Sequence, residues 1–249
     1  MTYCVGITVD DGLVLASDSR TNAGVDQVST YSKMHAFGSA GEWMVTLLSS
    51  GNLATTQAVT RQVRRDIENG AAGSLAGASR MAEAAEYIGE LNLLQQRKHA
   101  KSADESFNPE ASFIVAGQYA GQPAQLYLVY PEGNYIRASR QTPFLQIGES
   151  KYGKPILDRI IDADVDMETA ARCALVSMDS SMRSNLSVGP PIELLLYRTD
   201  SLSAGEHFEL DEDDEYLRRL RQAWEQELKE AFSRLPRLPG RDHAMRLVD

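Results

Sequence analysis

The sequence predicts an α+β fold of four layers, an αββα sandwich in which two stacked antiparallel sheets lie between two layers of helices. The first observation is that the apolar periodicity changes along the chain in blocks: strands, helices, strands, helices and a last strand. Blocks of this kind favour antiparallel sheets with helices outside them over a repeated βαβ unit. The second is the composition of the 249 residues, 43% hydrophobic and 24% charged, which fits one large globular domain or one domain with an appendage.

The first block is expected to form strands over residues 3–9, 13–18, 28–37 and 43–48. Segment 10–12 (Asp-Asp-Gly) is a hairpin signal between the first two strands. Read as a three-residue turn, it pairs Thr2 with Arg20 and places Asp18 on the same face as Thr2, at the diagonal distance of about 7–8 Å. The Asp18 carboxylate and the Thr2 hydroxyl are therefore expected to meet.

The remaining blocks follow from changes in apolar spacing. Helical spacing without proline predicts helices over 53–68 and 75–99. After a polar loop at 100–110, turn residues separate four short apolar runs that predict a second sheet. The expected elements from there on are strands at 113–119, 124–130, 134–139 and 144–148, helices at 152–162 and 167–183, and a strand at 192–198.

Residues 206–249 are expected to form a helical extension to a main domain that spans residues 1–205. Acidic residues at 211–215 suit the start of a helix. Apolar residues then recur every three or four positions, at Leu217, Leu220, Trp224, Leu228, Phe232 and Leu235. Such a stripe must be buried somewhere, either on the chain's own core or on a neighbouring subunit.

Composition excludes several classes of protein. The formal net charge of −10 disfavours nucleic acids and anionic membranes as partners. No apolar run is long enough to span a membrane, and no basic-then-apolar leader is found. Two cysteines are too few for a disulfide framework, so we expect a reduced, cytoplasmic protein.

Metal and nucleotide chemistry are not expected either. The four histidines lack metal-ligand spacing, and no phosphate-binding glycine loop occurs, so we expect no metal site and no cofactor. If ATP-driven unfolding is required, it must come from a separate ATPase or regulatory partner.

Thr2 becomes a candidate catalyst once Met1 is removed. It then carries both a hydroxyl nucleophile and a free α-amine, whose reference pKa of about 7.7–8.0 lets it accept the hydroxyl proton near neutral pH. A cation is needed nearby to favour the deprotonated amine and the developing alkoxide. Lys33, in phase with Tyr31 and His35 on the expected strand 28–37, is the candidate, and Asp18 would hold it.

The run "LASDSRTNAG" followed by Lys33 resembles the start of a proteasome-type β-subunit. Thr2, Asp18, Arg20 and Lys33 match the family pattern residue by residue. The order of elements resembles the four-layer fold of N-terminal-nucleophile (Ntn) hydrolases. Together with the C-terminal helix and the stretch "IGESKYGKPILDR", it resembles the bacterial Anbu (ancestral beta subunit) branch.

The resemblance implies further site residues. The backbone N–H of Gly51, in the Ser50-Gly51 pair, would form an oxyanion hole, and Ser150 and Asp179 would support the catalytic amine. Arg20 and Asn22 would bind substrate, Asn22 through its backbone, although the family pattern has threonine there. A further departure is that Met182 and Arg183 stand where the family has Ser-Gly, so the second supporting serine is missing or relocated to Ser181 or Ser184.

The resemblance implies a threonine peptidase that cleaves peptide or amide bonds of peptides or unfolded proteins through an acyl-enzyme on Thr2. Two alternatives stay open: a narrow-specificity amidase or transpeptidase on the same fold, and a non-catalytic assembly subunit. A homo-oligomer is implied in each case, as a closed ring or an open spiral. A chain that retains Met1 is expected to be inactive, because its Thr2 amine lies in a peptide bond.

Overall fold

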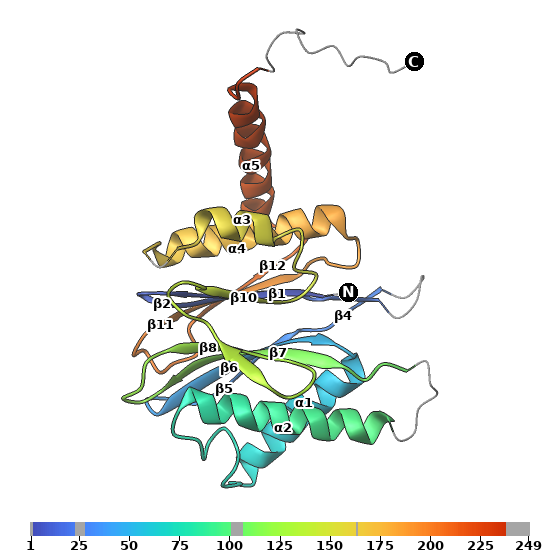
Figure 1. Cartoon of the computed structure of the whole chain (residues 1–249), viewed down its shortest axis with the longest axis vertical. Coiled ribbons are helices and arrows are strands. Elements are labelled where there is room, and N and C mark those ends of the chain that lie inside the picture. Colours follow the sequence, from blue (N-terminus) through green and yellow to red (C-terminus); the bar gives the residue numbers. More distant parts are fainter. Residues whose placement is uncertain (1, 23–27, 101–106, 163, 238–249) are drawn as a thin grey trace, which may run out of the picture.

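Two five-stranded sheets stacked face to face, with helices on both outer faces, make up the body of the protein (Figure 1). The computed structural model describes residues 2–22, 28–100, 107–162 and 164–237. The four-layer α+β prediction is confirmed by this arrangement. Met1 and residues 238–249 of the expected extension lie outside the described residues.

The first sheet has the order β10-β1-β2-β11-β12, and each neighbouring pair is antiparallel. Its strands are β1 (Tyr3–Val9), β2 (Gly12–Asp18), β10 (Phe144–Gly148), β11 (Ile192–Arg198) and β12 (Glu206–Leu210). Strand β11 coincides with its prediction. Strand β10 was expected in the second sheet, and its pairing with β1 corrects that assignment.

The second sheet has the order β5-β6-β7-β8-β9, and a separate two-stranded ribbon joins β3 and β4. The strands are β3 (Arg20–Asn22), β4 (Val28–Thr30), β5 (Met34–Ser39), β6 (Trp43–Gly51), β7 (Ala111–Tyr119), β8 (Gln125–Val129) and β9 (Tyr135–Arg137). The expected strand at 28–37 is therefore two strands, which belong to different sheets.

Five helices are found among the described residues. They are α1 (Leu53–Glu68), α2 (Met81–Ala100), α3 (Lys154–Ile160), α4 (Met167–Ser184) and α5 (Glu215–Ser233). Helix α1 coincides with its prediction. Helix α2 begins later than residue 75, because Ser79 donates its N–H and hydroxyl to the Glu83 carboxylate, at 2.8 and 3.0 Å, just before the first turn.

The β1–β2 turn is one residue shorter than expected. Val9 pairs with Gly12 and Cys4 pairs with Ser17, so only Asp10 and Asp11 lie in the turn. This register moves Asp18 opposite Tyr3, and the expected Thr2–Arg20 pairing is wrong. A one-residue slip moves every side chain of a strand to the other face, so turn length decides what β2 presents to each layer.

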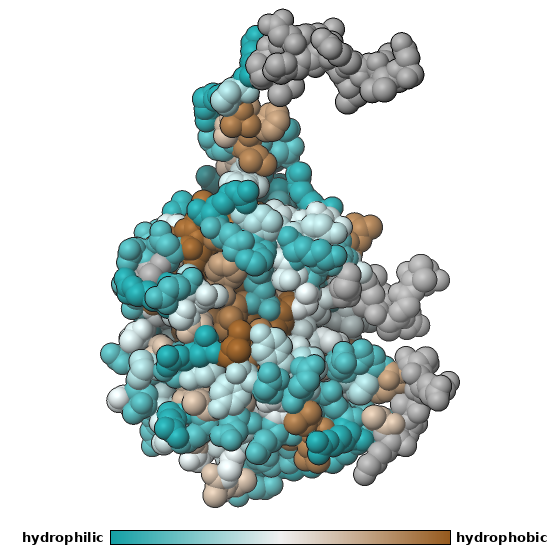
Figure 2. Space-filling view, in the orientation of Figure 1, coloured by the Kyte–Doolittle hydropathy of each residue, from teal (hydrophilic) through white to brown (hydrophobic). Residues whose placement is uncertain are grey.

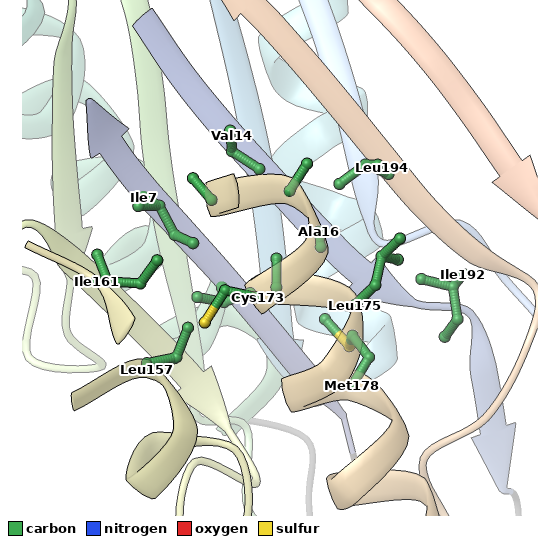
Figure 3. Close-up of a cluster of buried hydrophobic side chains, with 14 of the residues drawn as sticks. Ile7, Val14, Ala16, Leu157, Ile161, Cys173, Leu175, Met178, Ile192 and Leu194 are labelled. Atoms are coloured by element: carbon green, nitrogen blue, oxygen red, sulfur yellow. The ribbon is translucent and has the colours of Figure 1, made fainter. Parts of the chain in front are cut away.

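Alternation along the first sheet divides its apolar side chains between two cores. Tyr3, Val5 and Ile7 pack towards the α3/α4 layer, whereas Cys4 packs between the sheets. Figure 3 shows the outer core, where side chains of α4 lie against the sheet. Its labelled members are Ile7, Val14, Ala16, Leu157, Ile161, Cys173, Leu175, Met178, Ile192 and Leu194.

The segment from residue 206 begins with a strand, β12, which was not predicted, and continues as α5. Leu217 at the start of α5 is buried, but Leu228 and Phe232 further along are 53% and 75% exposed. Helix α5 stands out from the α3/α4 layer, and apolar atoms are visible on its surface (Figures 1 and 2).

The domain boundary at residues 205 and 206 stays a prediction. In the described part of the chain, every helix is too short or too polar to cross a membrane.

Candidate active site

One cleft gathers four of the predicted site residues: Thr2, Arg20, Lys33 and Gly51. Its volume is about 600 Å³. Polar side chains make up much of the rest of its lining, among them Ser32, His35, Ser49, Asn52, Thr56, Gln57, Asn108 and Glu110. The cleft is therefore formed by the ends of elements that are far apart in the sequence.

A buried ion pair lies beside Thr2. The Lys33 ammonium donates to Asp18 Oδ1 at 2.6 Å and to the Arg20 carbonyl at 2.7 Å. Asp18 is fully buried and also accepts from the Tyr3 N–H (3.0 Å) and the Gly189 N–H (3.2 Å). Burial raises the pKa of Asp18, while Lys33 and the two N–H donors act to lower it. Because Lys33 lines the cleft and two of its three N–H bonds have described acceptors, the third is available to the cleft.

Lys33 does not lie on a strand, contrary to the sequence prediction. It belongs to segment 31–33 between β4 and β5, where Tyr31 is exposed and Lys33 is 6% exposed, so the expected strand phase does not hold. The Ser49 N–H binds the Lys33 carbonyl at 3.0 Å. Ser32 Oγ binds the buried carboxylate of Glu193 at 2.8 and 3.0 Å. These contacts on either side fix the backbone that carries the ammonium.

Gly51 ends β6 in a conformation with φ of +103°. A Cβ there would lie 2.3 Å from the Glu110 carbonyl oxygen, which excludes any other residue without backbone movement. The next residue, Asn52, caps α1 by accepting from the Thr55 N–H at 3.1 Å. The strand-to-helix turn thereby holds the Gly51 backbone at the cleft.

Arg20 and Asn22, the expected substrate-binding residues, lie on β3. The Arg20 guanidinium donates to the Leu186 carbonyl at 2.9 Å, and the Arg20 backbone N–H donates to the Gly189 carbonyl at 3.2 Å. Asn22 pairs with Val28 in the two-stranded ribbon. Arg20 therefore binds the segment after α4 in addition to lining the cleft.

Ser150 and Asp179 are not among the residues that line the cleft. The Ser150 carbonyl accepts from the Lys154 N–H at 3.0 Å, at the start of α3. The Asp179 carboxylate accepts from Arg221 Nε on α5 at 2.5 Å and lies 3.7 Å from Arg183. Its described ionic partners thus belong to the helix layer, and its support of the Thr2 amine stays a prediction.

The proposed replacements for the missing serine do not reach the cleft either. Ser181 is fully buried, and its hydroxyl donates to the Ser177 carbonyl within α4 at 3.0 Å. Ser184 is exposed at the end of the same helix. Neither residue is among those that line the cleft.

Glu149 lies next to Thr2 and is bound by Asn185, and both residues were missed by the sequence analysis. The Glu149 N–H donates to the Thr2 carbonyl at 2.7 Å, and its carboxylate accepts from Asn185 Nδ2 at 3.0 Å. Gly148 has φ of +81°, and a Cβ there would lie 1.9 Å from the Thr2 carbonyl oxygen. The only sequence signal was the position of Glu149 inside "GES". Glu149 reaches Thr2 because β10 pairs with β1, and these strands are far apart in the sequence.

His35 also lines the cleft. Burial and the nearby Arg64 charge lower its pKa from 6.5 to about 4. Its imidazole is therefore neutral at pH 7, and Lys33 and Arg20 supply the positive charges of the cleft near Thr2.

The arrangement has close relatives among known proteins. The family of proteasome subunits matches residues 2–195. Anbu (ancestral beta-subunit) from Yersinia bercovieri is 41% identical, with a TM-score of 0.90 over 96% of this chain and 100% of that one. The chain belongs to the proteasome subunit family, in its Anbu branch. The resemblance predicted from the N-terminal motif and the order of elements is confirmed.

A second Anbu structure extends the comparison. The helical assembly of the Anbu complex from Pseudomonas aeruginosa contains a chain that is 44% identical, with a TM-score of 0.90 over 96% of this chain and 99% of that one. A search of curated proteins gave no match. Because the Anbu matches cover 96% of the chain, the proteasome-type Ntn fold is shared well beyond the family match at 2–195.

Proposed function

We propose that this proteasome-family chain is a threonine peptidase whose nucleophile is Thr2, freed by removal of Met1. The observation that supports this most is the position of the Lys33 ammonium, buried between Asp18 and the Arg20 carbonyl at a cleft that Thr2 shares. A fixed positive charge beside a hydroxyl and an amine lowers the energy of both deprotonated forms.

The mechanism follows from these groups. The Thr2 amine accepts the hydroxyl proton, directly or through one water, while Oγ1 attacks the substrate carbonyl. The Gly51 N–H stabilises the resulting oxyanion, and the tetrahedral intermediate collapses to an ester on Thr2 as the leaving amine takes the proton. Water activated by the same amine then hydrolyses the ester. Substrate peptide is held by backbone hydrogen bonds at Asn22, as an added strand.

The proposal is tested by intact-mass analysis of purified protein before and after reaction with a peptide epoxyketone, which needs both the hydroxyl and the amine of an N-terminal threonine. We expect a mass without Met1 and one adduct, located on Thr2 by peptide mapping. Thr2→Val, which keeps the shape but lacks the hydroxyl, should give no adduct. A chain that lacks Met1 and still forms no adduct would contradict the proposal.

Hydrolysis and transfer are separated by their products. If acyl transfer to an added amine exceeds hydrolysis, the same site is a transpeptidase, and a single accepted amide substrate would indicate a narrow amidase. The polar lining of the cleft does not favour either alternative over a peptidase.

We propose that the protein is cytoplasmic, since both of its cysteines are free and buried. We also propose that a separate ATPase partner unfolds folded substrates.

We also propose that the chain assembles with copies of itself through α5. Leu228 and Phe232 are exposed on this helix, exposed Leu235 follows just after its end, and a 44% identical relative forms a helical assembly. An interface of this kind joins different surfaces of successive copies and can close into a ring or continue as a spiral. Assembly through α5 is also compatible with the alternative that the chain is a non-catalytic assembly subunit.

Phe232→Asp is expected to shift the protein to smaller species in size-exclusion chromatography with light scattering, because a carboxylate cannot be buried in an apolar contact. Gln226→Asp is the matched control, since it adds the same charge to the same helix at an exposed position. Equal mass distributions for Phe232→Asp and the unmodified protein would exclude α5 from the interface.

A further inference from the structure

The unmodified protein has a buried carboxylate beside the Thr2 backbone that the mechanism above does not use. Glu149 is 4% exposed and is not among the residues that line the cleft. Asn185 Nδ2 donates to Oε2 at 3.0 Å, and Lys151 Nζ lies 3.7 Å from Oε1 on the exposed side. Burying a carboxylate is costly without a compensating partner, so this position needs an explanation.

The backbone geometry indicates which edge of the chain the Thr2 amine faces. In an extended chain, the N–H and C=O of one residue point to the same edge, and those of the next residue point to the opposite edge. The Thr2 carbonyl accepts from the Glu149 N–H, whereas the Tyr3 N–H donates to Asp18 on the other side. The Thr2 nitrogen therefore points towards Glu149 and away from Asp18.

Two close approaches hold this edge in place. The Glu149 N–H is 2.7 Å from the Thr2 carbonyl, and Gly148 contacts the Thr2 backbone so closely that no side chain fits there. Asn185 ends α4, and its own N–H binds the Ser181 carbonyl at 2.8 Å, so the amide that holds Glu149 is tied to a helix end. The carboxylate is thus positioned by two separate parts of the chain.

We propose that Glu149, held by Asn185, is the residue that orients the α-amine of processed Thr2 and pairs with its ammonium form. The inference rests on the proposed function in one respect, that Thr2 becomes the first residue. Glu149 acts through the amine and is a positioning residue. It takes the role that the sequence analysis gave to Asp179, whose described ionic partners are Arg221 and Arg183.

The charged groups around the amine set the direction of the effect. Lys33 and Arg20 on the cleft side oppose protonation of the amine, and Asp18 is already paired with Lys33. His35 is neutral at pH 7, and Lys151 reaches Glu149 only from solvent. Glu149 is then the negative group that favours the ammonium, and its removal should make the amine lose its proton at lower pH.

The test is the pKa of the Thr2 amine itself, read from the rate of its acetylation by acetic anhydride at a series of pH values, with peptide mass spectrometry. Protein whose mass shows Thr2 as the first residue is used. Glu149→Gln is expected to lower the midpoint by about 1 pH unit, the effect of removing one opposite charge at close range. Glu149→Asp, which keeps the charge, should stay near the unmodified protein.

Asp179→Asn is the matched comparison, because it removes another buried carboxylate, which lies on α4. A midpoint that moves in Asp179→Asn and stays constant in Glu149→Gln would overturn the proposal. If Glu149→Gln does not fold, Asn185→Ala replaces it, since loss of the amide should also lower the midpoint. An unchanged midpoint in Asn185→Ala would overturn the proposal as well.

The readout separates this inference from the proposed function, because acetylation needs only a free amine and no catalysis. A midpoint that shifts in Glu149→Gln would support the positioning role, and the absence of an epoxyketone adduct on the unmodified protein would at the same time contradict the peptidase. An adduct on the unmodified protein, with an unshifted midpoint in Glu149→Gln, would support the peptidase and contradict the positioning role.

Discussion

Lys33→Met is expected to slow epoxyketone reaction at Thr2 by about 10²–10³-fold, the range for loss of one preorganised group that stabilises developing negative charge. The unmodified ammonium lies 2.6 Å from Asp18 and faces the cleft, and methionine keeps most of the side-chain length without the charge. Without it, the Thr2 hydroxyl and amine both hold their protons more tightly. The measurement is the first-order rate of adduct formation by mass spectrometry.

The same change also removes the partner of a buried carboxylate, so stability must be measured beside the rate. Breaking a buried pair from one side costs about 3–5 kcal/mol. The double variant Lys33→Met with Asp18→Asn removes both charges and should recover part of that loss in urea unfolding while reaction stays slow. A folded Lys33→Met protein whose rate stays within about 10-fold of the unmodified rate, short of the smallest loss expected above, would exclude Lys33 from the chemistry.

Gly51→Ala is expected to reduce turnover by about 10²–10³-fold, the effect of losing one oxyanion donor. The added Cβ would lie 2.3 Å from the Glu110 carbonyl oxygen and 2.9 Å from the Ala111 Cα, so the backbone at the cleft must move. The measurement is the rate of acylation of Thr2 together with the midpoint of thermal unfolding.

Gly41→Ala is the matched control for backbone strain. Gly41 also has positive φ, +79°, but a Cβ there would meet nothing within 4 Å, and the residue lies in the β5–β6 turn outside the cleft lining. It should lose about 1–2 kcal/mol of stability from the left-handed conformation and keep the acylation rate. Equal rate losses in the two variants would mean that Gly51 acts only through stability.

The local sequence pattern was sufficient to predict an element whose bounds depend only on its own residues. The amphipathic spacing of 53–68 and the apolar run 192–198 have the bounds that their sequences predicted. The motif at Thr2, Asp18, Arg20 and Lys33 predicted the Lys33–Asp18 pair and, together with the order of elements, the family. In these cases the deciding residues are neighbours or belong to one short pattern.

The errors have a different cause, since each depends on contacts between distant segments. The β1–β2 register was decided by whether Gly12 belongs to the turn or to the strand, and it pairs with Val9 and Arg198 in the sheet. Which sheet takes β10 depends on its pairing with β1, and Lys33 leaves the strand because segment 31–33 crosses from one sheet to the other. No periodicity within a short window carries this information.

The supporting residues show the same limit. Asp179 and Ser150 matched short family patterns, but their contacts are made by α5 and α3. Glu149 and Asn185 are 36 residues apart in the sequence and meet only after β10 and α4 have both docked. One sequence offers no signal for such a pair.

The three donors that hold Asp18 come from distant parts of the chain, Tyr3 and Lys33 near its start and Gly189 far along it. A nascent polypeptide that has not yet brought strand β11 and its preceding segment into place lacks the Gly189 contact, and its lysine is not yet confined beside the threonine. On the proposed mechanism, Thr2 would therefore be inactive during synthesis and would become reactive only in the folded chain.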